Sequence, residues 1–188
     1  MNAYFDDMRL PEKRKNKVPM PMGPAHLAGA FQPDLCEIKL INEMYSGPLL
    51  DEKQFAWPDM LVLTGLTVSF DRMRQLTAYA KTKNPNVIVV AGGPAIRALP
   101  KLSLKFFDEA CLGDVEEMQT VIKKYFGAEY VSKNMIPRFD LTHSMGRLNY
   151  VETSRNCNFS CSFCSIAGEG GSYLKYDLEF VRKQIMSL

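Results

Sequence analysis

The chain has 188 residues, a formal net charge of +2 and five cysteines. That length suits one domain, or one domain with part of a second, and so small a charge gives no reason to expect nucleic acid or a membrane surface as partner. No apolar stretch approaches the roughly 18 residues of a membrane span, and the polar start is unlike a secretory signal.

These features predict a cytoplasmic protein. In that reducing compartment, five cysteines indicate metal or redox chemistry rather than disulfides. Two of them, Cys36 and Cys111, lie alone in apolar surroundings, and we expect them to be buried thiols of the core.

The first twenty residues show no helix or strand periodicity and predict an irregular arm, whose basic run at 13–17 is typical of a solvated segment. A helix is expected from Pro24, which suits a first helical position, to Phe31. Partial alternation of apolar residues then predicts a strand over residues 36–41.

Three further strands are expected, separated by helices. Continuous apolar runs over 59–64 and 86–91 are typical of strands covered on both faces, and a shorter run over 109–112 predicts a third. Helical spacing of apolar residues predicts helices over 69–83 and 114–125. Strands that alternate with helices indicate a parallel sheet between two helical layers, an α/β, Rossmann-like fold.

The chain changes character after these units. Residues 128–147 have little periodicity and predict a linker. A strand is expected over 148–154. A final helix is expected from Asp177, with one apolar face made by Leu178, Val181, Ile185 and Leu188.

Small residues follow the expected strands, where ligands of open α/β sheets bind. They are Thr64 and Gly65, Gly92 and Gly93, and Gly113. A glycine lets a flat ligand approach the backbone closely. Tight turns would need the same residues, so the pattern leaves both interpretations open.

Cys157, Cys161 and Cys164 form a C-x3-C-x2-C pattern directly after the expected strand. Soft sulfur ligands this close together select zinc, copper or an iron–sulfur cluster. Structural zinc needs a fourth ligand, which would have to come from His143 or a distant cysteine. Three cysteines suit a [4Fe–4S] cluster with one open iron better, while zinc and ordinary thiols stay as alternatives.

The cysteine pattern, with the aromatic Phe163 before its last cysteine, resembles the radical SAM superfamily. The resemblance implies that the three cysteines bind a [4Fe–4S] cluster, whose open iron binds S-adenosylmethionine, and that Phe163 packs beside the S-adenosylmethionine. The cofactors would carry the radical chemistry. Residues 148–188 would then be the first strand, loop and helix of a partial (β/α) barrel.

A second resemblance rests on four upstream motifs: Met22-Gly23-x3-Leu27-Ala28, Leu63-Thr64-Gly65, Gly92-Gly93-Pro94 and Gly113-Asp114-x-Glu116. They are similar to the cobalamin-binding-type domain that precedes the barrel in one radical SAM subgroup, which includes B12-dependent methyltransferases and tetrapyrrole ring cyclases. The resemblance implies cobalamin across the strand ends, beside the small residues named above.

This likeness divides the chain into four parts. We expect an irregular arm over 1–20, a cobalamin-binding-type domain over 21–127, a linker over 128–147 and an incomplete radical SAM domain over 148–188.

The sequence departs from the subgroup in two respects. Residues 1–20 contain no apolar run to supply the usual first strand. The cobalt-ligand motif D-x-H-x-x-G is also missing, because Pro24 stands where its Asp belongs. We therefore expect His26 to be an ordinary helix residue.

Two functions follow. The chain is expected to be the N-terminal part of an enzyme that cleaves S-adenosylmethionine and acts on a small-molecule substrate, with or without cobalamin, in methyl transfer or tetrapyrrole-type radical chemistry. The alternative is a non-catalytic accessory subunit of a larger complex, built on a degenerate cobalamin-type domain. Because one strand–helix unit cannot bury its own apolar face, either a longer chain or a protein partner is expected to complete the fold.

Overall fold

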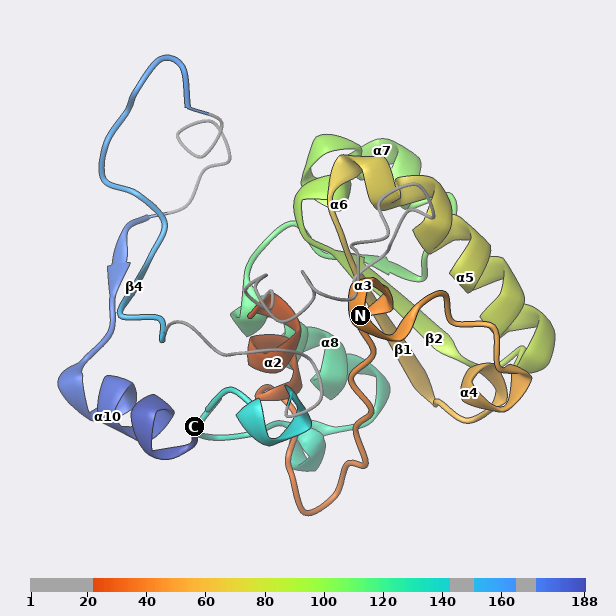
Figure 1. Ribbon diagram of the computed structural model, residues 1–188, viewed down its shortest axis with the longest axis horizontal. Coiled ribbons are helices and arrows are strands. Elements are labelled where there is room, and N and C mark those ends of the chain that lie inside the picture. Colours follow the sequence, from red (N-terminus) through yellow and green to blue (C-terminus); the bar gives the residue numbers. More distant parts are fainter. Residues whose placement is uncertain (1–21, 143–150, 165–171) are drawn as a thin grey trace.

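A parallel three-stranded sheet forms the centre of the computed structural model, which describes residues 22–142, 151–164 and 172–188 (Figure 1). The strands lie in the order β1-β2-β3, with Met60 beside Ile88 and Val90 beside Glu109. Their bounds are β1 (Met60–Thr64), β2 (Ile88–Gly92) and β3 (Glu109–Ala110). These bounds confirm the three strands expected at 59–64, 86–91 and 109–112.

Helices cover both faces of the sheet. Helices α5 (Phe70–Lys83) and α6 (Pro94–Ala98) pack on one face of the sheet, where the Leu63 side chain is buried between sheet and helices. Helices α2 (Gly23–Ala28) and α8 (Val115–Tyr125) lie on the other face. There the buried side chains are Ala30, Val90, Val115, Met118, Val121 and Ile122. The expected Rossmann-like α/β architecture is therefore confirmed.

Short elements connect these layers. They are the helices α3 (Glu43–Ser46), α4 (Glu52–Ala56) and α7 (Pro100–Ser103), and the single 3₁₀ turns η2 (Thr67–Ser69), η3 (Ala128–Tyr130) and η4 (Phe139–Thr142).

The strand expected over residues 36–41 is wrong as an element of the observed sheet. No strand is assigned there. Cys36, Ile38 and Leu40 are nevertheless half-buried, while Glu37 and Lys39 between them are exposed. The side chains therefore alternate in burial as the sequence predicts. A strand also needs a hydrogen-bonded neighbouring strand, and the alternation does not predict whether one is present.

The described part of the expected linker, residues 128–142, packs against α2. The Ser132 amide donates to the Ala30 carbonyl at 2.8 Å, and the Arg138 amide donates to the Ala25 carbonyl at 3.0 Å. Phe139 is buried against Ala25 and Met22. This segment therefore holds the start of the domain in place.

The end of the chain forms a small unit beside α2 (Figure 1). It holds β4 (Ser154–Arg155), β5 (Leu174–Lys175) and α10 (Leu178–Met186), which begins at Asp177 as expected, with that carboxylate accepting the Phe180 amide at 2.7 Å. β4 and β5 are antiparallel.

Of the strand expected over 148–154, the structure describes residues 151–154, and only Ser154 belongs to a strand. Residues 151–153 are outside any strand, and β4 has an antiparallel neighbour rather than the parallel one of a barrel. Residues 148–150 lie outside the described residues, as do 1–21, which include the expected arm. The expected apolar face of α10 leaves Leu178, Ile185 and Leu188 exposed. Within the described ranges, no helix is both long enough and apolar enough to cross a membrane.

Candidate functional site

The carboxyl ends of the three strands lie at one edge of the sheet, because the strands are parallel. Thr64 is the register partner of Gly92, and Gly65 and Gly93 directly follow these two residues. The structure thus brings four of the five small residues singled out in the sequence side by side. Gly113 follows the neighbouring strand β3 at the same edge.

Gly93 is the residue at this edge that must be glycine. Its φ of 85° lies in a region that side chains rarely adopt. A Cβ atom built there would lie 2.5 Å from the Thr64 hydroxyl oxygen. The close approach at Gly93 is therefore made by Thr64 of the chain itself, and it locks the β2–α6 turn against the end of β1.

We expect Gly93→Ala to lower the free energy of unfolding by about 2–4 kcal/mol, since backbone strain and overpacking each cost about 1–3 kcal/mol. Gly92→Ala is the matched control. A Cβ at Gly92 would meet Cys111 at 3.7 Å, an ordinary contact, so this variant should lose less than about 1 kcal/mol. Urea unfolding of both proteins measures the difference, and equal losses would contradict the argument.

Arg97 of α6 clamps the loop that contains Gly113. Its guanidinium donates to the carbonyl oxygens of Leu112 and Gly113 at 2.9 and 3.0 Å and to the Asp114 carboxylate at 2.8 Å. The Gly113 amide donates to Glu117 at 2.6 Å. The β3–α8 loop is therefore held in one shape at the sheet edge.

Three apolar side chains at this edge are exposed: Leu66, Val68 and Leu112. Sequence analysis missed them, although Leu66 and Val68 lie within four residues after an expected strand and Leu112 is the last residue of another. An apolar, strand-end surface of this kind suits a large flat ligand. Cys111, half-buried beneath it, is no thiolate, because burial, with Glu117 and Glu109, raises its pKa to about 12.

The predicted cluster ligands lie in the segment between β4 and β5. Cys157 and Cys161 are exposed, Cys164 is half-buried, and all three are free thiols. Phe163 is 91 % exposed. Asn156, at a φ of 61°, donates its side-chain amide to the Ser172 carbonyl at 3.0 Å and closes the base of this segment.

The described residues contain no group of three or more His, Cys, Asp or Glu side chains close enough to hold one metal ion. The donor chemistry fits an iron–sulfur cluster, since three accessible, unpaired thiols are available. The three sulfur atoms do not lie close together in this structure, so the segment would have to change conformation for all three to bind one cluster.

An ion-pair network joins the cysteine segment to the first domain. Arg155, two residues before Cys157, donates to Glu116 of α8 at 2.9 Å and to Glu152 at 2.8 Å. Burial by itself would lower the pKa of Arg155, but the hydrogen bond to Glu152 and the charges of Glu152 and Glu116 raise it. Tyr176 donates its hydroxyl to the same Glu152 carboxylate at 3.1 Å.

His26 is an ordinary buried helix residue at the end of this network, as expected. Its Nδ1 lies 3.7 Å from the Glu152 carboxylate. Burial lowers its pKa below 6.5, although Glu152 opposes this. A histidine whose folded-state pKa is depressed favours folding while it is neutral, so this contribution is complete above about pH 6.5 and declines as the pH falls.

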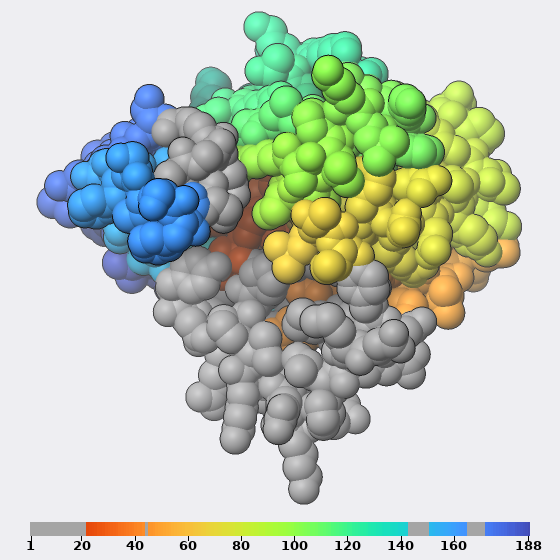
Figure 2. Space-filling model, turned by 90° about the horizontal axis from the view of Figure 1, so that it is seen from above, coloured from red at the N-terminus to blue at the C-terminus, as the bar shows by residue number. Residues whose placement is uncertain are grey.

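Figure 2 shows the molecule from the side of the strand ends. The cysteine segment, in blue, and the loops after β1 and β2, in yellow and green, border a hollow with α2, in red, at its floor. The segment that contains the cysteines and the loops after β1 and β2 therefore lie on the same side of the molecule.

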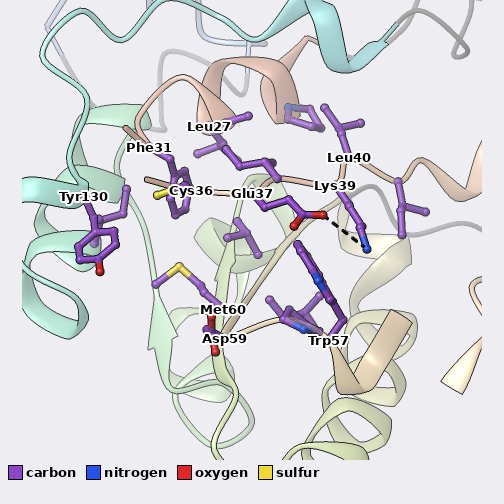
Figure 3. A pocket seen from close by; sticks show the side chains of 18 of the residues that line it. Leu27, Phe31, Cys36, Glu37, Lys39, Leu40, Trp57, Asp59, Met60 and Tyr130 are labelled. Atoms are coloured by element: carbon purple, nitrogen blue, oxygen red, sulfur yellow. Dashed lines mark ion pairs between the residues drawn. The ribbon is translucent and has the colours of Figure 1, made fainter. Parts of the chain in front are cut away.

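A second concavity lies beside the outer edge of β1 (Figure 3). It has a volume of about 380 Å³ and is lined by α2, α8, residues 35–41 and β1. The labelled side chains at its wall include Leu27, Phe31, Leu40, Trp57 and Met60.

Comparison with known proteins assigns a family to the domain that contains the parallel sheet. The family model described as B12 binding domain matches residues 17–123, more than half of the chain. The chain belongs to the B12-binding domain family. No curated protein and no solved structure matches the sequence.

The family assignment supports the predicted cobalamin-binding-type domain and cobalamin as a ligand of this B12-binding domain. The residues at the strand ends fit that group. Leu66, Val68 and Leu112 are exposed at this edge, and a large flat molecule can pack on an apolar surface of this kind.

Proposed function

We propose that this B12-binding domain holds cobalamin across its strand-end edge and that the chain is the N-terminal part of a radical SAM iron–sulfur enzyme. One observation carries the proposal: the C-x3-C-x2-C segment is tied by Arg155 to Glu116, on the first turn of a helix of the B12-binding domain itself. A metal-ligand motif and a cobalamin-type edge thus lie on the same side of the molecule.

Cobalamin would lie against Thr64, Gly65, Gly92, Gly93 and Gly113, with the exposed leucines and valine of the edge beneath it. Gly92 has room for a small side chain, so it tests contact with the ligand without disturbing the fold.

Cys157, Cys161 and Cys164 would hold a [4Fe–4S] cluster, and the exposed Phe163 ring would cover bound S-adenosylmethionine. When bound, the cluster supplies the electron that cleaves S-adenosylmethionine. The residues of this chain contribute the ligands and, through Arg155, their position beside the cobalamin edge. The reaction would be methyl transfer or tetrapyrrole-type radical chemistry on a small-molecule substrate in the cytoplasm.

Anaerobic reconstitution with iron and sulfide tests the proposal. We expect about four irons per chain, the broad visible absorption of a cluster and a low-temperature electron paramagnetic resonance signal that shifts when S-adenosylmethionine is added. Cys161→Ser should lose the signal, and Cys36→Ser, a half-buried thiol outside the motif, should keep it. Absence of a cluster in the wild type would overturn the radical SAM assignment.

The accessory-subunit alternative is favoured by a different observation, the exposed apolar residues Leu178, Ile185 and Leu188 at the end of the chain. An interaction surface needs no cluster. A wild-type protein that binds hydroxocobalamin in an absorbance titration but incorporates no iron would support this alternative.

A further inference from the structure

The residue before the first cysteine of the motif has an unusual backbone conformation. Asn156 has a φ of 61°, and among the described non-glycine residues only Met135, at 50°, also has a positive φ. Asparagine is one of the few residues that tolerate this left-handed region. Because β4 ends at Arg155, Asn156 is the point at which the chain turns from the strand into the cysteine segment.

The side chain of Asn156 holds this turn from the neighbouring strand. β4 and β5 are antiparallel, with Arg155 beside Leu174. Just beyond that pair, the Asn156 side-chain amide donates to the Ser172 carbonyl at 3.0 Å. The conformation at Asn156 is therefore fixed by a contact outside its own strand.

The turn that follows Asn156 includes a hydrogen bond to a cysteine sulfur. The Phe159 amide, two residues along the chain, donates to Cys157 Sγ at 3.5 Å. A hydrogen bond to a ligand atom orients that ligand and influences the metal centre that it binds. The backbone around Cys157 therefore suits a metal ligand.

The other two cysteines of the motif are joined by a separate turn. The Cys164 amide donates to the Cys161 carbonyl at 3.1 Å, which is the hydrogen bond of a β-turn. The motif thus consists of two locally ordered parts. One metal centre can bind all three cysteines only when these parts approach each other, and the direction in which the chain leaves Asn156 determines where the first part lies.

We propose that Asn156 is a positioning residue for the cysteine metal centre, because its left-handed backbone and its bond to Ser172 set the turn in which the Phe159 amide donates to Cys157. The proposal rests on the proposed function in one respect, that the three cysteines bind a soft metal centre together. Asn156 itself has no contact with the metal.

The cadmium ion alone is the probe, since soft cations bind thiolates and cadmium needs neither sulfide nor S-adenosylmethionine. The full chain, reduced and free of oxygen, is titrated with cadmium against a competing chelator. Ultraviolet absorption of the cadmium–thiolate bonds gives the affinity. Asn156→Val places a β-branched residue at a φ that it rarely adopts, and backbone strain of this kind should weaken binding at least about tenfold.

Two further variants separate the backbone conformation from other effects. Asn156→Gly retains access to a positive φ and loses only the exposed bond to Ser172, so its affinity should fall no more than about threefold. Asn158→Val is the matched control. Asn158 is an exposed asparagine of the same segment whose φ is not positive, and this variant should bind cadmium like the wild type.

Nuclear magnetic resonance with a spin-active cadmium isotope gives a readout that a purely structural role would not change. In the wild type, cadmium should couple to the Cβ protons of Cys157 and, through the sulfur, to the Phe159 amide proton. The coupling to Phe159 should disappear in Asn156→Val and remain in Asn156→Gly.

Folding of each variant is checked separately. Circular dichroism reports on the B12-binding domain. Exchange of the Tyr176 amide, which donates to the Thr153 carbonyl at 3.1 Å, reports on the β4–β5 pair. If Asn156→Val opens that pair, the wild type and Asn156→Gly still decide the outcome through the coupling to Phe159.

Three results would overturn the proposal: no cadmium bound by the cysteines of the wild type, no coupling to Phe159 in its cadmium complex, or equal affinities of the wild type and Asn156→Val. An equal loss in Asn156→Gly and Asn156→Val would also do so, because the backbone conformation would then not matter. A wild type that binds cadmium as expected but takes up no iron and sulfide would contradict the proposed function and leave the role of Asn156 supported.

Discussion

Replacement of Arg72 by leucine is expected to lower the free energy of unfolding by about 3–5 kcal/mol, as when one partner of a buried ion pair is removed. The Glu43 side chain is 0 % exposed, and it accepts from Arg72 Nη2 at 2.8 Å and from Arg72 Nε at 3.1 Å. Loss of the guanidinium leaves the carboxylate buried without its cation. Urea unfolding measures the effect.

The same helix offers a matched control. Arg74→Leu removes an exposed pair with Asp71 and a contact over the Phe106 ring, together worth about 1 kcal/mol. Adding Glu43→Gln to Arg72→Leu should recover part of the loss, because a neutral amide still accepts the Leu49 amide that Glu43 accepts at 2.8 Å. Equal losses in the two single variants would contradict the buried-pair argument.

The Glu43–Arg72 pair also holds the end of the segment 36–41, which lines the concavity beside β1. Glu43 begins α3, two residues after Ile41, and Arg72 lies on α5. The pair therefore anchors the end of that segment to the helical layer.

Arg155→Met is expected to release the cysteine segment from the B12-binding domain. Removing the buried guanidinium from the half-buried Glu152 costs about 2–5 kcal/mol, while the loss of its pair with the exposed Glu116 adds at most about 1 kcal/mol. Amide exchange should accelerate in residues 151–155 and in α10, which Gln184 links to the Glu152 backbone at 2.8 Å. The exchange of β1 and β2 should stay unchanged.

Arg182→Met is the control for this prediction. Arg182 lies on α10 and pairs only with its exposed neighbour Glu179 among the described contacts, so its loss should change exchange little. If Arg155→Met and Arg182→Met leave the same protection in α10, the network does not hold the segment.

Local pattern by itself determined the longer strands and helices. The apolar runs at 59–64 and 86–91 became β1 and β2, because a strand covered on both faces has no polar positions. Helical spacing predicted α5 and α8, and Asp177 caps α10 as its side chain allows. The small residues at the strand ends meet because parallel strands end at one edge.

Only the tertiary structure decided the features that depend on distant neighbours. Residues 36–41 carry the alternation of a strand, yet no strand of the described residues pairs with them, and a sequence period contains no information about pairing. Gly93 is held by Thr64, some thirty residues earlier in the chain. Arg155 joins Glu116 across thirty-nine residues. Burial of apolar surface determines how the layers pack on one another. Charged groups and close contacts then form between residues that this packing brings near each other.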